Sequence, residues 1–231
     1  MKYVVYDLET NGLDYTKDQP IEIGAIAVDN NGTAKQYDYF IKTPELLSED
    51  IKRITGITDE MTAGGVDLKL GIEQLFNILG MYPDGYDEDI TIIGHNIIGF
   101  DNLFLKKYID LYNYQMPAKK QFFDTAGAFR AKLLREEKYV YENDYDLQER
   151  VLKLGTKGPR YNLSAACQHY GIPLDEATRH RADYDCLCTL RVFEKQAGIK
   201  LLPDVLKNSP DQETAIEDQA NNKSGQGAFN F

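Results

Sequence analysis

The stretch Tyr3-Val-Val-Tyr-Asp-Leu-Glu-Thr-Asn-Gly12 sets an apolar run directly against two carboxylates. Tyr3–Tyr6 has the β-branched and aromatic composition of a strand, and the polar residues from Asp7 onward predict its end. Side chains two apart on a strand point to the same face, so Asp7 and Glu9 can converge on one point. An acid pair at this spacing is common, and by itself it more often marks an ordinary polar loop.

The segments that follow predict a mixed sheet with helices. Ile21–Val28 reads as a second strand, and turn residues separate it from a returning strand at Gln36–Lys42. Ile90–Ile93 is a buried-type strand, and Phe122–Asp124 is extended. Helical spacing of apolar residues covers 48–54, 68–79, 103–112, 125–134, 163–170 and 181–196. Strands first, then alternating helices and strands, predict an α/β fold with a mixed sheet.

Composition limits the classes of function. The chain has 231 residues, with 26 Lys and Arg against 37 Asp and Glu, a net charge of −11. This balance excludes a protein that holds nucleic acid by a positive field over its whole surface. It leaves room for a nucleic-acid enzyme whose positive charge comes from bound metal ions.

Cellular context follows from the same data. No apolar run approaches the roughly 20 residues that span a bilayer. Asp7 and Glu9 interrupt any signal-peptide pattern at the start, and three cysteines imply no disulfide framework. We expect a soluble, cytoplasmic protein with no membrane partner.

The chain divides into a domain and a tail. Residues 1–200 form the expected domain, with a polar, partly ordered insertion near 136–158. Residues 201–231 are expected to be a flexible acidic tail, rich in Asn, Gln, Ser and Gly.

Two further motifs carry candidate chemistry. In Gly94-His-Asn-Ile-Ile-Gly-Phe-Asp101, the aspartate lies where the chain leaves a strand and enters a helix, which also suits a helix N-cap. In His180-Arg-Ala-Asp-Tyr-Asp185, a carboxylate on a helix and an imidazole at its start suit an attacking water and its base. A solvated helix start is the alternative for this histidine.

Taken together, the motifs point to metal ions. Asp7, Glu9, Asp101 and Asp185 lie at predicted strand ends or on the facing helix. Carboxylates gathered this closely repel one another unless cations neutralise them. Oxygen ligands favour Mg²⁺ or Mn²⁺, and two such ions about 3.5–4 Å apart suit displacement at phosphorus.

The order of the three motifs resembles the DEDDh branch of the DnaQ-like 3′→5′ exonuclease superfamily. The matching residues are Asp7-Leu-Glu9, Asn96-Ile-Ile-Gly-Phe-Asp101 and His180-Arg-Ala-Asp-Tyr-Asp185, within a resemblance that runs to about residue 198. Phe123-Asp-Thr125 resembles a further helix start of the family. Arg181 stands where the tyrosine branch has its tyrosine, which favours the histidine branch. The second motif is longer than in the polymerase III epsilon subunit and looks more like proofreading domains built into replicative polymerases.

This resemblance implies a fold and a set of roles. The fold would be ribonuclease H-like, a mixed five-stranded sheet flanked by helices. Asp7, Glu9, Asp101 and Asp185 would bind two metal ions, with His180 as general base. The residues implied to hold the substrate are Thr10 and Leu13, the latter as a wedge between bases. Asn96 is a further candidate, and Phe100, next to Asp101, is the aromatic residue best placed to stack on a base. Asn11 replaces the threonine that is more usual after the first motif.

Other segments suggest contacts with partners. The basic pairs Lys106–Lys107, Lys119–Lys120 and Arg179/Arg181 could contact phosphates, or could be ordinary solvated surface. The ending Gln226-Gly-Ala-Phe-Asn-Phe231 resembles the short peptide with which bacterial replication proteins dock on the sliding clamp.

We therefore expect a metal-dependent 3′→5′ exonuclease of proofreading or repair type that releases nucleoside 5′-monophosphates from single-stranded DNA. An RNA exonuclease or an oligonucleotide scavenger would use the same site, because no residue declares itself a reader of the 2′-OH. A catalytically silent polymerase or clamp adaptor is the alternative from another class.

Overall fold

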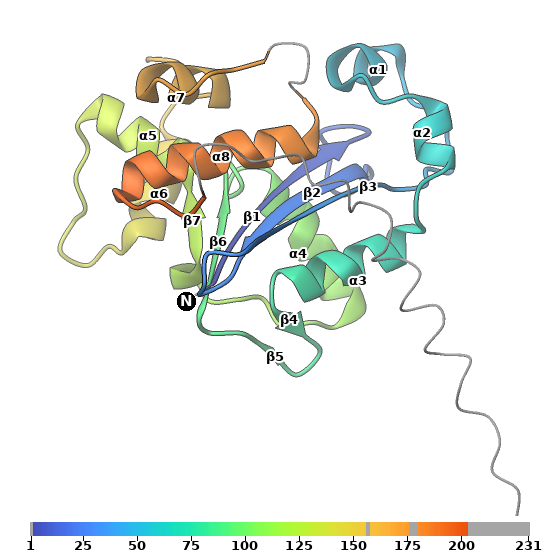
Figure 1. Ribbon diagram of the computed structural model, residues 1–231, viewed down its shortest axis with the longest axis horizontal. Helices are drawn as coiled ribbons and strands as arrows, with labels where there is room; N and C mark the ends of the chain where they lie inside the picture. The colour runs from blue at the N-terminus through green and yellow to red at the C-terminus, as the bar shows by residue number, and fades with distance from the viewer. Residues whose placement is uncertain (1, 156–157, 176–179, 203–231) are drawn as a thin grey trace, which may run out of the picture. The chain divides into compact units, whose positions relative to one another are not determined.

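A five-stranded mixed sheet forms the centre of the computed structural model, which describes residues 2–155, 158–175 and 180–202 (Figure 1). Its strand order is β3-β2-β1-β6-β7. β1 pairs antiparallel with β2 and parallel with β6, so both directions meet at the central strand. The five strands are β1 (Lys2–Thr10), β2 (Pro20–Val28), β3 (Ala34–Phe40), β6 (Ile90–Gly94) and β7 (Phe122–Asp124). The predicted mixed α/β sheet is confirmed.

β1 is longer than the sequence predicts. It continues through Asp7 and Glu9, which lie opposite Gly24 and Glu22 of β2. The prediction that the strand ends at Asp7 is therefore wrong. Backbone pairing with β2 sets the length of this strand, because strand propensity depends strongly on the neighbouring strand.

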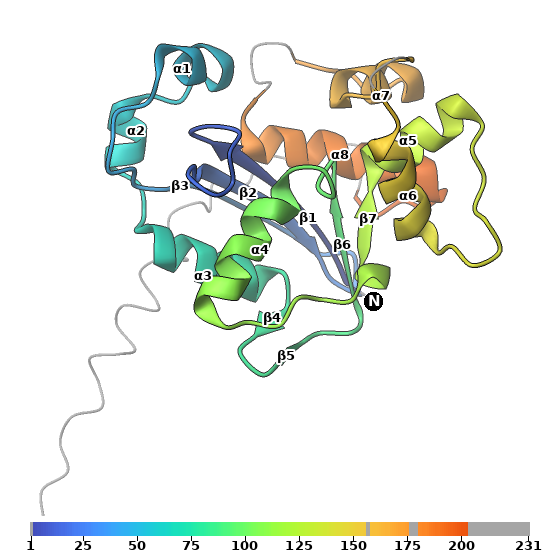
Figure 2. The same ribbon diagram turned by 180° about the vertical axis from the view of Figure 1, so that it is seen from behind.

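The two faces of β1 meet different helices. Val4, Tyr6 and Leu8 point into the main core, which they share with α3 (Leu68–Ile78) and α4 (Asp101–Tyr112). On the opposite face the ring of Tyr3 lies 5.7 Å from that of Phe193 in α8. Figures 1 and 2 show α8 (Ala182–Ala197) over one face of the sheet and α3 and α4 over the other. Asp7 and Glu9 share the face of Tyr3 and therefore face α8.

Gly24 lets the start of α8 approach the sheet closely. A Cβ built on this glycine would lie 2.4 Å from the backbone carbonyl carbon of Ala182. Because that neighbour is backbone and not a flexible side chain, any larger residue would push the helix away from β2. The first turn of α8 is thus held next to the strand that pairs with Asp7 and Glu9.

The polar stretch 136–158 contains a packed helix. α6 (Asp144–Lys153) begins at Asn143, whose side chain accepts a hydrogen bond from the backbone of Asp146. Its buried Gln148 accepts a 2.9 Å hydrogen bond from the Asp124 backbone. The sequence does not predict this helix, because only Gln148 and Val151 of its ten residues are buried. The expected tail lies outside the described residues from residue 203 onward.

The remaining elements complete the domain. They are α1 (Glu49–Thr55), α2 (Asp59–Ala63), β4 (Met81–Tyr82), β5 (Gly85–Tyr86), η1 (Lys119–Gln121), α5 (Thr125–Leu134) and α7 (Leu163–Tyr170). The three cysteines are free and buried. None of the helices in the described ranges is long and apolar enough to cross a membrane.

Candidate active site

The first and third sequence motifs meet at the face of β1 that α8 covers. Glu9 comes from β1, Asp185 from α8, and His180 lies just before α8 begins. The metal-binding atoms that these three side chains offer all lie within 4.8 Å of one another. The predicted convergence of the first and third motifs is therefore present in the fold.

Asp101 joins the same cluster from the opposite helix layer. Its carboxylate accepts a 3.0 Å hydrogen bond from the backbone N–H of Leu8, between the two acidic residues of β1. The side chain is 3% exposed. The N-cap of α4 is Phe100, so the alternative interpretation of Asp101 as a helix cap is wrong. Asp101 is instead a buried carboxylate fixed beside Asp7 and Glu9.

The cluster carries more negative charge than its surroundings compensate. Burial raises the pKa of Asp7 well above its ordinary range, and the charges of Asp101 and Asp185 raise it further. Burial, followed by the charges of Asp185 and Glu22, raises the pKa of Glu9 to about 9. Burial raises the pKa of Asp101 to about 7. A set of oxygen ligands with unmet negative charge fits hard divalent cations.

His180 is held in an uncommon backbone conformation. Its φ is +64°, in the left-handed region, where a non-glycine residue is strained. Among the described residues, Asn96 of the second motif is also left-handed, with φ +69°. Asn113 and Arg135 share this conformation, but each ends a helix, where it is common. The two described non-glycine residues that are left-handed without ending a helix, His180 and Asn96, are therefore both predicted site residues.

An ion pair between partly exposed Arg181 and buried Glu22 fixes the start of α8. The Nε of Arg181 donates to Oε1 of Glu22 at 2.7 Å, and the backbone N–H of Ala182 donates to Oε2 of the same carboxylate at 3.0 Å. Glu22 is fully buried. Arg181 also lies 3.4 Å from a carboxylate oxygen of Asp38. Because His180 and Asp185 flank this anchor, it positions both of them.

Sequence reasoning missed this anchor. Arg181 was a candidate phosphate contact, and the structure pairs it with Glu22 instead. The available signal is Glu22 itself, a charged residue inside the apolar run Ile21–Val28. A buried charge of this kind requires a partner.

A second buried carboxylate, Asp124, shapes the loop that carries the second motif. It accepts hydrogen bonds from the backbone N–H groups of Asn96 and Ile98, both at 2.9 Å. It also caps α5 through the backbone N–H groups of Ala126 and Gly127. The segment Phe123-Asp-Thr125 therefore links the end of β6 to α5.

Of the predicted substrate-binding residues, Thr10 follows Glu9 and Phe100 precedes Asp101 in the chain. Thr10 is buried, and its hydroxyl donates to the carbonyl of Gly12 at 2.6 Å. Leu13 is 83% exposed, as a wedge between bases would need to be. The ring of Phe100 packs 5.1 Å from that of Phe104.

The candidate lysines for phosphate contacts are mostly engaged elsewhere. Lys106 pairs with Asp110 at 2.8 Å, and Lys119 pairs with Asp146 and Glu149. Lys107 donates to the carbonyl of Asp18 at 3.0 Å. These contacts favour the solvated-surface interpretation of the three side chains.

The chain is similar to known proteins in sequence and in fold. A family model described as RNase_T exonuclease matches residues 4–193. The PolC-type DNA polymerase III of Mycoplasma genitalium is 28% identical over 212 residues, covering 89% of this chain and 12% of that protein. Its counterpart in Thermotoga maritima is 37% identical over 213 residues, covering 89% of this chain and 13% of that protein. The chain therefore spans a small part of the length of these relatives.

Solved structures give the same fold. E. coli exonuclease I in complex with a dT13 oligonucleotide has a TM-score of 0.60 and 19% identity, covering 84% of this chain and 41% of that chain. The ribonuclease H-like arrangement of a mixed five-stranded sheet between helices is thereby confirmed.

The anchor at the start of α8 predicts a large effect on stability. Arg181→Met would leave buried Glu22 with the Ala182 backbone N–H but without its cationic partner. We expect the free energy of unfolding to fall by about 3 kcal/mol, the low end for a buried pair, because Arg181 is partly exposed. Arg53→Met is the control, because the Asp50–Arg53 pair is exposed and its loss costs at most about 1 kcal/mol. Urea unfolding of both variants measures the difference. Equal losses would contradict the anchor.

The carboxylate cluster predicts a pH dependence of the metal-free protein. Folded Glu9, with a pKa near 9, keeps a proton that the unfolded chain loses at much lower pH. The stability linked to this proton is therefore lost as pH rises, and the free energy of unfolding should fall between about pH 6.5 and pH 9. His95, whose pKa burial lowers to about 4, contributes with the opposite sign between about pH 4 and pH 6.5, where the unfolded chain takes up this proton first. Its contribution therefore falls at and below the lower edge of the window.

Urea unfolding in chelator at pH 6.5, 7.5 and 8.5 tests this dependence. Glu9→Gln should flatten the slope, and Mn²⁺ should stabilise the native protein most at the highest pH. A slope that is unchanged in the variant would contradict the assignment.

Proposed function

The chain belongs to the RNase_T exonuclease family, within the DnaQ-like 3′→5′ exonucleases, and we propose that it is a metal-dependent enzyme of the DEDDh branch. Its proposed reaction is the removal of nucleotides from the 3′ end of single-stranded DNA, released as nucleoside 5′-monophosphates. The observation that carries this proposal is the meeting of Glu9, His180 and Asp185 within 4.8 Å, on the strand face that also holds Asp7.

Four carboxylates would hold the metal ions. Asp7, Glu9, Asp101 and Asp185 offer only oxygen ligands, which suit two Mg²⁺ or Mn²⁺ ions. Such ions, when bound, stabilise the charge on the attacking and leaving oxygens of a phosphodiester. The raised pKa values of Asp7, Glu9 and Asp101 support this role, because they report buried negative charge that Arg181 offsets only in part at Glu9.

His180 would take the proton from the attacking water. Its ring lies beside Glu9 and Asp185, so water at the carboxylate cluster is within its reach. The strained backbone of His180 and the anchor at Arg181 would hold the ring in position without contact from the substrate. The proton that His180 accepts can then pass to the leaving 3′ oxygen or to solvent.

The residues around the cluster would hold the terminal nucleotides. Exposed Leu13 would separate the last two bases, and Phe100 would offer a ring edge beside Asp101. Thr10 would contribute through its backbone, because its hydroxyl is bonded to Gly12. Asn96, from the second motif, would contact the substrate strand.

We propose DNA as the substrate because of the proteins to which the chain is similar. The sequence relatives are DNA polymerases, and the structural neighbour is bound to a DNA oligonucleotide. An RNA exonuclease or scavenger would use the same carboxylates, and a silent adaptor would not need them. Digestion of matched 5′-labelled DNA and RNA strands, with Mn²⁺ or with chelator, separates these functions. A metal-dependent ladder that shortens from the 3′ end supports the enzyme, and its absence on both strands supports the adaptor.

The assignment of the base predicts a loss of rate without a loss of metal. His180→Ala should lower kcat about 100- to 10,000-fold, because general bases contribute about that much, while Mn²⁺ binding is retained. His169→Ala is the matched control, since His169 is exposed and packs on Phe129 outside the cluster. Single-turnover digestion gives the rate and calorimetry gives Mn²⁺ affinity. A fully active His180→Ala enzyme would show that another group removes the proton.

A second prediction concerns the C-terminal peptide, which lies outside the described residues. We propose that Gln226–Phe231 docks on a bacterial sliding clamp, as its resemblance to clamp-binding peptides suggests. Deleting these residues should abolish binding to the clamp in surface plasmon resonance and leave digestion of short oligonucleotides unchanged. Clamp binding that survives the deletion would remove this proposal.

A further inference from the structure

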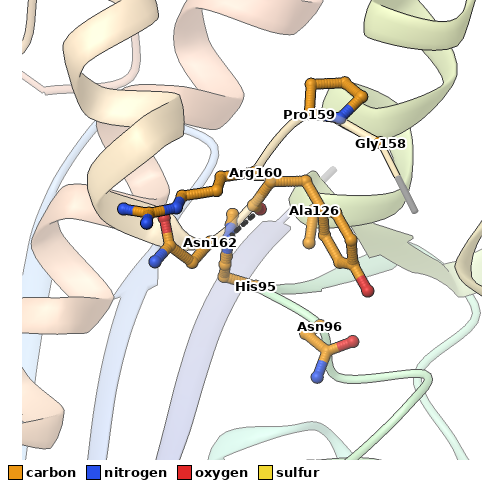
Figure 3. A pocket seen from close by; sticks show the side chains of 8 residues that line it. His95, Asn96, Ala126, Gly158, Pro159, Arg160 and Asn162 are labelled. Carbon is orange, nitrogen blue, oxygen red and sulfur yellow. Dashed lines mark hydrogen bonds between the residues drawn. The ribbon is translucent and has the colours of Figure 1, made fainter. Parts of the chain in front are cut away.

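A cavity of about 490 Å³ opens beside Asn96 of the second motif. It is lined by residues 158–162 together with His95, Asn96 and Ala126 (Figure 3). Residues 158–162 precede α7 and form one side, and Asn96, which follows β6, forms another. Asn96 belongs to the motif that ends at Asp101, so the cavity adjoins the loop that leads into the proposed active site.

Two lining side chains offer hydrogen-bond donors that nothing in the described ranges occupies. The guanidinium of Arg160 is exposed and has no carboxylate or carbonyl partner among the described residues. The side-chain amide of Asn96 is likewise without a hydrogen bond there. Other arginines nearby are engaged, since Arg130 donates to the carbonyls of Leu154 and Gly155, both at 2.7 Å. An unpaired arginine stands out in a chain of net charge −11.

The frame of the cavity is fixed before any ligand arrives. One ring nitrogen of His95 lies 3.0 Å from the carbonyl oxygen of Tyr161 (Figure 3), and the other lies 2.8 Å from the hydroxyl of Thr125. The residue next to Arg160 is therefore tied to the end of β6. Asp124 holds the backbone N–H of Asn96. These contacts fix the backbone on both sides of the cavity, so that only the side chains of Arg160 and Asn96 would have to be ordered on binding.

The donor set selects an anion with several oxygens. The planar fork of an arginine matches the oxygens of a phosphate. The Asn96 side chain lies at the other end of the lining (Figure 3), so it would reach another part of the same nucleotide. A neutral ligand would form no ion pair with Arg160. The polynucleotide strand that would enter the proposed active site carries one phosphate between each pair of nucleotides.

We propose that this cavity is a second phosphate subsite, which takes a phosphodiester of the substrate strand on the 5′ side of the bond being cut. This inference rests on the proposed function, because it requires a polynucleotide substrate. Arg160 pairs with the phosphate and Asn96 donates to the same nucleotide. The subsite holds the strand without touching the reacting atoms, so Arg160 acts on binding of the strand and not on the chemical step.

Arg160→Gln tests the subsite, with Arg160→Lys as the conservative variant and Arg53→Gln as a control on the exposed helix α1. The full chain is assayed on dT8 and on the 4-nitrophenyl ester of thymidine 5′-monophosphate, which has no phosphodiester on the 5′ side. Arg160→Gln should raise KM for dT8 about tenfold and leave kcat and hydrolysis of the ester within twofold. Arg160→Lys should recover part of the loss.

Salt dependence gives a second readout. Loss of one phosphate contact to a single strand should make the slope of log(kcat/KM) against log[NaCl] less steep by about 0.7. Arg53→Gln should leave the slope unchanged. Equal losses on dT8 and the ester, or no loss on dT8, would overturn the subsite.

Binding separates this proposal from the proposed function. If wild-type enzyme cuts neither substrate, the proposed function fails, and anisotropy of labelled dT8 in Ca²⁺ still tests Arg160. Weaker binding by Arg160→Gln supports the subsite. Binding unchanged by Arg160→Gln overturns it. Competition with millimolar inorganic phosphate is measured for labelled dT2 and for labelled dT8. If phosphate displaces both to the same extent, the cavity binds free phosphate, and the assignment to the substrate strand is overturned.

Discussion

Mutual repulsion of carboxylates on one face of β1 is the constraint on which the rest of the structure depends. Asp7 and Glu9 lie in the part of β1 that pairs with β2, on the face that α8 covers, and Asp101 is fixed to the backbone between them. Desolvation and like charge both disfavour this arrangement, as the raised pKa values record. Contacts outside the cluster must therefore hold α8 in place against this repulsion.

Those contacts come from carboxylates that are not proposed to bind metal. Glu22 holds the start of α8 through Arg181 and the Ala182 backbone, and Gly24 allows the helix to approach. Asp124 holds the loop of the second motif through backbone N–H groups. Each of these two acids is fully buried and has its hydrogen bonds satisfied within the protein. Buried acids with satisfied hydrogen bonds thus position the acids of the proposed metal site.

Much of this arrangement could be predicted from the sequence, for identifiable reasons. Apolar periodicity located α3, α4, α5, α7 and α8, because each buries one face. Spacing within motifs located the acidic residues, because a strand or a helix turn fixes which side chains share a face. The length of β1 was not predictable, since pairing with β2 decided it. Helix α6 was missed because only Gln148 and Val151 of its ten residues are buried. The Glu22–Arg181 ion pair was missed because 159 residues separate the two partners in the sequence.

The central claim is that the four carboxylates form one site for two divalent ions. Calorimetric titration of the full chain with Mn²⁺, in the presence of thymidine 5′-monophosphate, tests it most directly. The account predicts two ions per chain, with binding of at least one lost in both Asp7→Asn and Asp101→Asn. Stoichiometry and affinity that are unchanged in both variants would contradict it.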